Sequence, residues 1–151
     1  MIDQMMSEWV CMVKAVEVWF HSAHHLTKGT GFAGDHDTYG KIYSQIQNEF
    51  DDVAERVLGL TNQESFLCPK EILAKTQEIL SAYPSPANMS DYDIAMSALS
   101  IITNYCIWEN NFHSMIDDAG LLTIGLDDLL SNNASNHEKY VYLLQQRTKK
   151  Q

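Results

Sequence analysis

The chain has 151 residues, of which 45% are hydrophobic and 20% are charged, and its formal net charge is −10. This length and apolar content predict a single globular domain over residues 1–151, with a sizeable core. An acidic domain repels the phosphate backbone of nucleic acids and attracts cations. No apolar run is long enough to cross a bilayer, and the start of the chain lacks the pattern of a secretory signal.

The cysteines indicate a reducing compartment. Cys11, Cys68 and Cys106 show no paired spacing, and two of them fall within helical patterns. Disulfide frameworks and zinc motifs both require paired spacing, so we expect neither. A cytoplasmic location fits this composition best.

The first helical pattern covers residues 2–28. Its apolar residues recur at steps of three and four, which predicts a helix with one buried face; these residues include Trp9, Val13, Val16 and Phe20. Glu17 and His21 stand four residues apart. That spacing leaves two alternatives open: Glu17 pairs with His21, or it lies beside a functional site.

A second helix is predicted over residues 36–58, after a turn that contains Gly29 and Gly31. Asp35 is the expected N-cap, and Gly59 is the expected end. A long apolar face runs between them, which includes Tyr39, Ile42, Ile46, Val53 and Val57.

Residues 61–89 form a connection too long for a plain loop in a compact domain. Pro69 stands where a helix would begin, so a short helix is predicted from there to Lys75. A third helix is predicted to begin at Ser90 and to end near Ala119–Gly120. A fourth is predicted from about Thr123 to Gln146, and residues 131–136 in its middle have poor helix propensity. Long crossovers are one known way to connect a four-helix bundle, so the predicted fold is all-α.

Two histidines and two carboxylates stand out in the first half of the chain: His24, His36, Asp51 and Glu55. These ligand types suit a transition metal of intermediate softness, iron above all. Along one helix, the rise from His36 to Asp51 is about 22 Å, which is far beyond one coordination sphere. If the four serve one metal, each pair must come from a different subunit.

Four segments in register resemble the Dps mini-ferritins, a family named for DNA protection during starvation. They are residues 24–29 (HHLTKG), 34–36 (GDH), 51–56 (DDVAER) and 137–144 (HEKYVYLL). The most specific feature is the spacing of the two histidines and two carboxylates, and the resemblance runs from about Trp9 to Leu144.

This resemblance implies a ferritin-like four-helix bundle with a short extra helix in the crossover between helices two and three. It also implies a homo-oligomeric hollow shell, a dodecamer built from two-fold dimers. His24 and His36 of one subunit, with Asp51 and Glu55 of its mate, would bind ferrous iron at each two-fold interface. The activity implied is that of a ferroxidase, which oxidises this iron with hydrogen peroxide or dioxygen and stores the ferric mineral in protection against oxidative damage.

The sequence departs from the family pattern at two positions. The family often has an acidic residue where this chain has Gly40, and its loss would weaken a second iron position unless Asp37 compensates. The family usually has tryptophan where this chain has His25, which would alter radical handling or add a ligand. These departures support an alternative function, a non-catalytic Dps-like shell or DNA-compacting protein with a degraded ferroxidase site.

Other ionisable residues are interpreted more simply. Glu109 and His113 stand four residues apart, whereas di-iron sites inside one bundle use a spacing of three, so a helix-face contact is expected. Four aspartates near the start of the fourth helix either line a pore, as the resemblance implies, or form a solvated helix start: Asp117, Asp118, Asp127 and Asp128.

We do not expect direct DNA binding. The N-terminus lacks a basic arm, and the only basic cluster is the C-terminal tail with Arg147, Lys149 and Lys150. Repetition of this tail in an oligomer would add avidity, but against a strongly acidic shell.

Overall fold

A computed structural model describes residues 1–150, and within that range every regular element is a helix and there is no strand. The main helices are α1 (Ile2–Leu26), α2 (Phe32–Thr61), α3 (Pro69–Ser81), α4 (Asp91–Asp118) and α5 (Ile124–Thr148). Two 3-10 turns, Gly29–Gly31 and Glu64–Leu67, lie in the connections. The predicted all-α fold is confirmed. None of the described helices is both long and apolar enough to cross a membrane.

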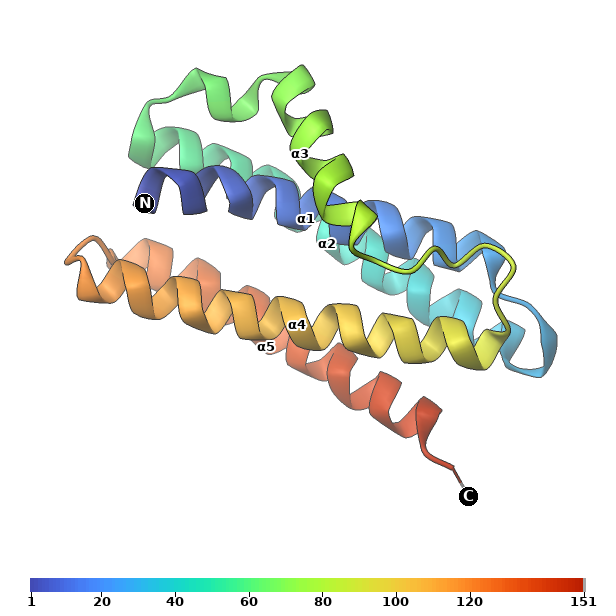
Figure 1. Ribbon diagram of the computed structural model, residues 1–151. Coiled ribbons are helices and arrows are strands. Elements are labelled where there is room, and N and C mark those ends of the chain that lie inside the picture. The colour runs from blue at the N-terminus through green and yellow to red at the C-terminus, as the bar shows by residue number, and fades with distance from the viewer. Residues whose placement is uncertain (151) are drawn as a thin grey trace.

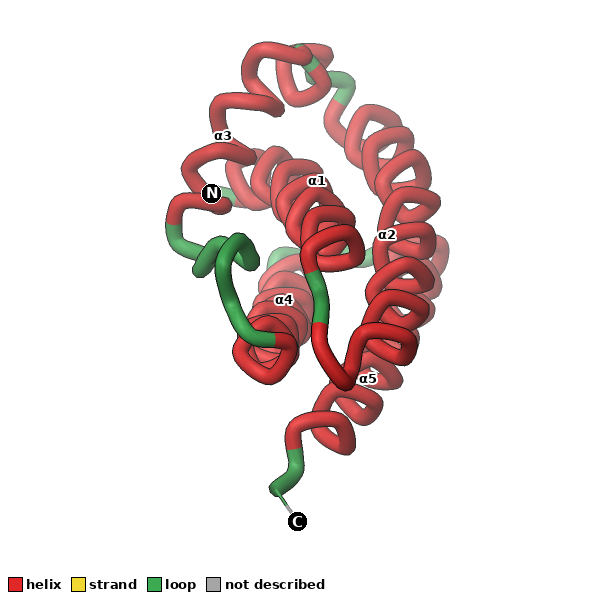
Figure 2. The backbone as a smooth tube through the Cα atoms, turned by 90° about the vertical axis from the view of Figure 1, so that its right-hand side faces the viewer, coloured by secondary structure: helices red, strands yellow, loops and turns green. Residues whose placement is uncertain are grey.

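The four long helices form a bundle, and α3 lies outside it. Figure 1 shows α1 alongside α2 and α4 alongside α5, with α3 packed against α1. Figure 2, turned by 90°, shows α3 and the following loop on the outer side of α1. The predicted short helix in the crossover is therefore present, and it extends to Ser81 rather than Lys75.

The core fills the space between the four long helices. Its largest fully buried side chains come from every one of these helices: Trp9, Phe20, Tyr39, Ile42, Tyr105, Phe112, Leu126 and Leu144. The Trp9 and Phe112 rings lie 5.1 Å apart and tie α1 to α4. Burial of these large apolar surfaces is the main favourable contribution to folding.

Side-chain caps set two of the helix starts. The Ser90 hydroxyl accepts a hydrogen bond from the Asp93 N–H, and the Thr123 hydroxyl accepts one from the Leu126 N–H. Each satisfies a backbone donor that has no partner within its helix. The predicted opening of the third helix at Ser90 is confirmed.

Three details of the predicted helices are wrong. Helix α2 begins at Phe32, so Asp35 lies inside its first turn rather than at the N-cap. It continues through Gly59 and ends at Asn62, which adopts the left-handed conformation. Helix α5 is unbroken through residues 131–136, because Asn133 is buried in the bundle and tertiary packing outweighs weak helix propensity.

An ionic cluster holds the turn between α1 and α2 in place. Arg147 near the end of α5 donates two hydrogen bonds to Asp35, at 2.9 and 3.0 Å, and one to Asp91 at 3.2 Å. Asp91 also accepts the Gly31 backbone N–H at 2.9 Å. The turn and the beginnings of α2 and α4 are therefore fixed to the end of α5.

Candidate metal centre

His24 and His36 come together where α1 ends and α2 begins. Their rings stack with centroids 3.8 Å apart and planes 17° apart. Nδ1 of His24 donates to the carbonyl oxygen of His36 at 2.6 Å, and Nδ1 of His36 donates to that of His24 at 2.7 Å. The two residues thus hold each other across the turn.

This reciprocal bonding fixes the tautomer of both rings. A carbonyl oxygen only accepts hydrogen bonds, so Nδ1 carries the proton in each ring. In the neutral imidazole, Nε2 then keeps its lone pair and can bind a metal ion. Metal-binding histidines commonly use their second ring nitrogen in this way, because the hydrogen bond orients the ring.

Gly40 lies against the His24 ring. A Cβ atom added at Gly40 would lie 2.9 Å from both Cε1 and Nδ1 of His24. Any larger residue, including the acidic one often found in the family, would therefore displace this ring. His24, His36 and Gly40 line a surface groove, and Asp37, the expected substitute carboxylate, lines it too. Asp37 is exposed and accepts a hydrogen bond from Lys41 at 2.7 Å.

Two further histidines, His21 and His25, are exposed on α1. His21 stacks on Tyr43 with ring centroids 4.2 Å apart. The ring centroid of His25 lies 4.7 Å from that of His21 and 5.2 Å from that of His24. Desolvation and the neighbouring histidines lower the pKa of His25. Of the two alternatives for Glu17, pairing with His21 is wrong, because Glu17 binds Lys14 at 2.9 Å instead.

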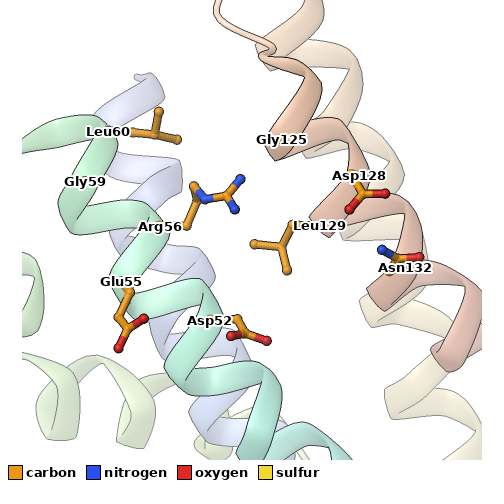
Figure 3. Close-up of a pocket in the computed structure, with 9 residues that line it drawn as sticks. All are labelled: Asp52, Glu55, Arg56, Gly59, Leu60, Gly125, Asp128, Leu129 and Asn132. Atoms are coloured by element: carbon orange, nitrogen blue, oxygen red, sulfur yellow. The ribbon is translucent and has the colours of Figure 1, made fainter.

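Asp51 and Glu55 are both exposed on α2. Glu55 lines a groove whose walls come from α2 and α5. Figure 3 shows that Arg56 projects from α2 toward α5, with Asp128 on the opposite wall.

A single chain does not assemble the predicted ligand set. Helix α2 is continuous from Phe32 to Thr61, so the separation of about 22 Å between His36 and Asp51 applies. Among residues 1–150, no three His, Cys, Asp or Glu side chains form a group that could hold a metal ion. His24 and His36 already lie together in the single chain, whereas Asp51 and Glu55 are exposed farther along α2.

A buried polar triad, which was not predicted from the sequence, lies in the centre of the bundle. Nε2 of His137 lies 2.7 Å from Glu49, and Nδ1 of His137 lies 2.8 Å from Glu109. The three side chains come from α5, α2 and α4, and all are buried. A signal was present, because each residue occupies a core position in its helix: Glu49 follows Ile42 and Ile46 at helical spacing.

The triad places a cation between two carboxylates. Burial lowers the pKa of His137, but hydrogen bonds to Glu109 and Glu49 outweigh it and raise the pKa to about 9. Burial raises the pKa of Glu109, against the opposing effect of His137. The raised pKa of His137 favours the protonated ring at neutral pH, in which both ring nitrogens carry protons and donate to the two carboxylates.

The expected helix-face contact between Glu109 and His113 is wrong, because each has another partner. His113 pairs with Asp127 at 2.7 Å, while Glu109 binds His137. All four aspartates near the start of α5 are exposed: Asp117, Asp118, Asp127 and Asp128.

The sequence was compared with protein families and with known proteins. No protein-family model matches the sequence. Over 143 residues the chain is 24% identical to General stress protein 20U of Bacillus subtilis (strain 168), with 95% of this chain and 91% of the relative covered.

Several solved structures resemble the structure of this chain over nearly its whole length. A Dps structure from Mycobacterium smegmatis matches with a TM-score of 0.83 and 15% identity, over 99% of this chain and 86% of that one. A Dps protein from Vibrio cholerae O1, described as a member of a superfamily of ferritin-like diiron-carboxylate proteins, matches with a TM-score of 0.76 and 15% identity, over 98% and 89%. The resemblance found in the sequence is thus confirmed in three dimensions, and the chain has the fold of the Dps proteins.

Proposed function

We propose that this protein is a mini-ferritin that binds and oxidises ferrous iron and stores the ferric product. The binding site is shared between two subunits: His24 and His36 of one, and Asp51 and Glu55 of the other. The observation that carries this proposal is the reciprocal hydrogen bonding of the two histidines, which leaves both Nε2 atoms free as ligands.

The geometry of α2 supports a shared site. Its two ligand groups lie near opposite ends of one continuous helix, so one chain cannot bring them to the same ion. A two-fold axis that pairs two α2 helices in opposite directions would place the histidines of each chain beside the carboxylates of the other. Such an isologous contact repeats the site twice in every dimer.

The chemistry transfers one electron from each iron to the oxidant. Two ferrous ions and one hydrogen peroxide, with two protons, give two ferric ions and two water molecules. The histidines contribute nitrogen ligands and Asp51 and Glu55 contribute oxygen ligands, a mixture that suits both oxidation states of iron. With dioxygen as oxidant, four ferrous ions and four protons give four ferric ions and two waters.

The proposed assembly is a hollow dodecamer in which the ferric product is stored. The Dps fold and the protein's acidity support storage of a cation in a shell. The rival function, a shell without useful iron chemistry, keeps some support from Gly40, because the His24 ring fills the space of the family's acidic side chain.

Anaerobic titration with ferrous iron, followed by addition of peroxide, tests the proposal. The wild type should bind iron saturably and oxidise it quickly, whereas His36→Ala and Asp51→Ala should each lose both properties. Asp52→Ala, which removes a neighbouring exposed carboxylate, is the matched control and should behave as wild type. Equal slow oxidation in every protein would favour the non-catalytic shell.

Mixing the two inactive variants tests whether the site is shared. A dimer of one His36→Ala subunit and one Asp51→Ala subunit has one doubly altered site and one intact site. Co-refolded mixtures should therefore recover part of the wild-type oxidation rate. If mixing restores nothing although the subunits exchange, the ligands do not come from two chains.

A further inference from the structure

Near its end, α1 carries a second pair of histidines beside the proposed iron site. His21 and His25 are one helical turn apart, both are exposed, and their ring centroids lie 4.7 Å apart. Within residues 1–150, neither ring makes a hydrogen bond or an ion pair, in contrast to His24 and His36, whose Nδ1 atoms are both engaged. All the nitrogen atoms of this pair are thus available to a ligand.

The surrounding residues restrict the His21 ring. It stacks on Tyr43 of α2 with a centroid distance of 4.2 Å and an interplanar angle of 17°. A ring already fixed by packing loses less conformational entropy when it binds a ligand. Tyr43 therefore orients His21 toward the same side of α1 as His25.

We propose that His21 and His25 form a second metal site, which takes a borderline divalent transition cation such as Zn²⁺. Two histidines at positions i and i+4 of a helix present their nitrogens to one ion, the spacing used in helical zinc sites. Water molecules complete the coordination sphere. The site uses none of the four residues proposed to bind iron, and the ring centroids of His25 and His24 lie 5.2 Å apart.

The ligand type determines which metals this pair selects. Two imidazoles without a carboxylate favour zinc, nickel and copper, whereas magnesium and calcium require oxygen ligands. The mixed nitrogen and oxygen set proposed for iron differs in this respect. The two sites therefore separate by metal class, and zinc should occupy the His21–His25 pair at concentrations where magnesium does not.

Calorimetric titration of the assembled protein with Zn²⁺ tests this site. The variant His21→Phe/His25→Gln keeps a ring against Tyr43 but removes both nitrogen ligands. It should lose one binding step that the wild type shows, and excess Mg²⁺ should not compete for that step. The variant His24→Gln/His36→Gln should retain the same step, which separates this site from the proposed iron site.

Chemical modification locates the bound ion. Diethylpyrocarbonate acylates accessible histidines, so His21 and His25 should be modified in the metal-free protein and protected when Zn²⁺ is bound, as read by peptide mass spectrometry. Thermal melts without metal check that each variant is folded. Unchanged zinc titration in His21→Phe/His25→Gln, or modification of both histidines in the presence of saturating zinc, would overturn the proposal.

Discussion

Replacement of His137 by leucine should destabilise the fold strongly, because it leaves two buried carboxylates without their cation. Glu49 and Glu109 are 4% and 2% exposed, and His137 is fully buried between them. Breaking a buried ion pair by removal of one partner costs about 3–5 kcal/mol. We expect His137→Leu to lower the free energy of unfolding at pH 7 by an amount in this range.

The wild-type protein should also lose stability as the pH rises above neutrality. The pKa of His137 is raised in the folded state from 6.5 to about 9, so folding favours the protonated ring. Its contribution is fully present below pH 6.5 and is lost as the pH rises through 9. At about 1.4 kcal/mol for each pKa unit, this contribution is about 3 kcal/mol.

Glu109 affects a different pH range. The pKa of Glu109 is also raised in the folded state, so the stability that this group contributes declines as the pH rises above 4.5, its ordinary pKa. Both groups therefore change the stability in the same direction, and each lowers it as the pH rises.

Urea denaturation at fixed protein concentration, at several pH values between 6.5 and 9, measures both effects. The wild type should become less stable across this range, and the decline should be smaller in His137→Leu, which lacks the titrating ring. A triple variant with leucine at all three positions should recover most of the loss at neutral pH, because an apolar core avoids the desolvation cost. A cost of less than about 1 kcal/mol for His137→Leu would refute the argument that the triad is charged.

Two further variants test the region around the proposed iron site. Gly40→Ala should abolish iron binding, as measured by titration, because the new Cβ displaces the His24 ring. The stability measured by thermal melts should change little, because alanine favours the helix by about 0.5–1 kcal/mol and this gain offsets the displacement of the ring. Arg147→Met should destabilise the fold by about 2 kcal/mol in urea denaturation, because Asp35 is 4% exposed and loses its cation.

Each of these variants has a matched control in the same region. A Cβ added at Gly34, also in α2, meets nothing within 4 Å, so Gly34→Ala should raise stability and leave iron binding unchanged. Lys41→Met breaks an exposed ion pair with Asp37, whose side chains are 73% and 63% exposed, and should change stability by less than about 0.5 kcal/mol. Equal effects of Gly40→Ala and Gly34→Ala on iron binding would contradict the role given to the His24 ring.

The helices were predictable from the sequence because their apolar residues recur at helical spacing. Helix ends were less so, since they depend on distant partners: Asp35 resembles an N-cap, but Arg147, which is 112 residues away in the chain, holds it inside the first turn of α2. The spacing of His24 and His36 predicted their proximity, but not the reciprocal hydrogen bonds. These depend on the conformation of the turn between the helices.

The buried triad was missed for a related reason: a charged residue in a core position is normally interpreted as a surface residue. Its partners lie on two other helices, so no local pattern in the sequence identifies them. This triad also explains how the bundle interior accommodates two carboxylates. The His137 imidazolium supplies the positive charge between Glu49 and Glu109, and both its N–H groups are used. A cation inside the bundle would have to displace that ring and forfeit both hydrogen bonds. The His137 ring thus fills the space between the two carboxylates, whereas His24 and His36 line a groove at the surface.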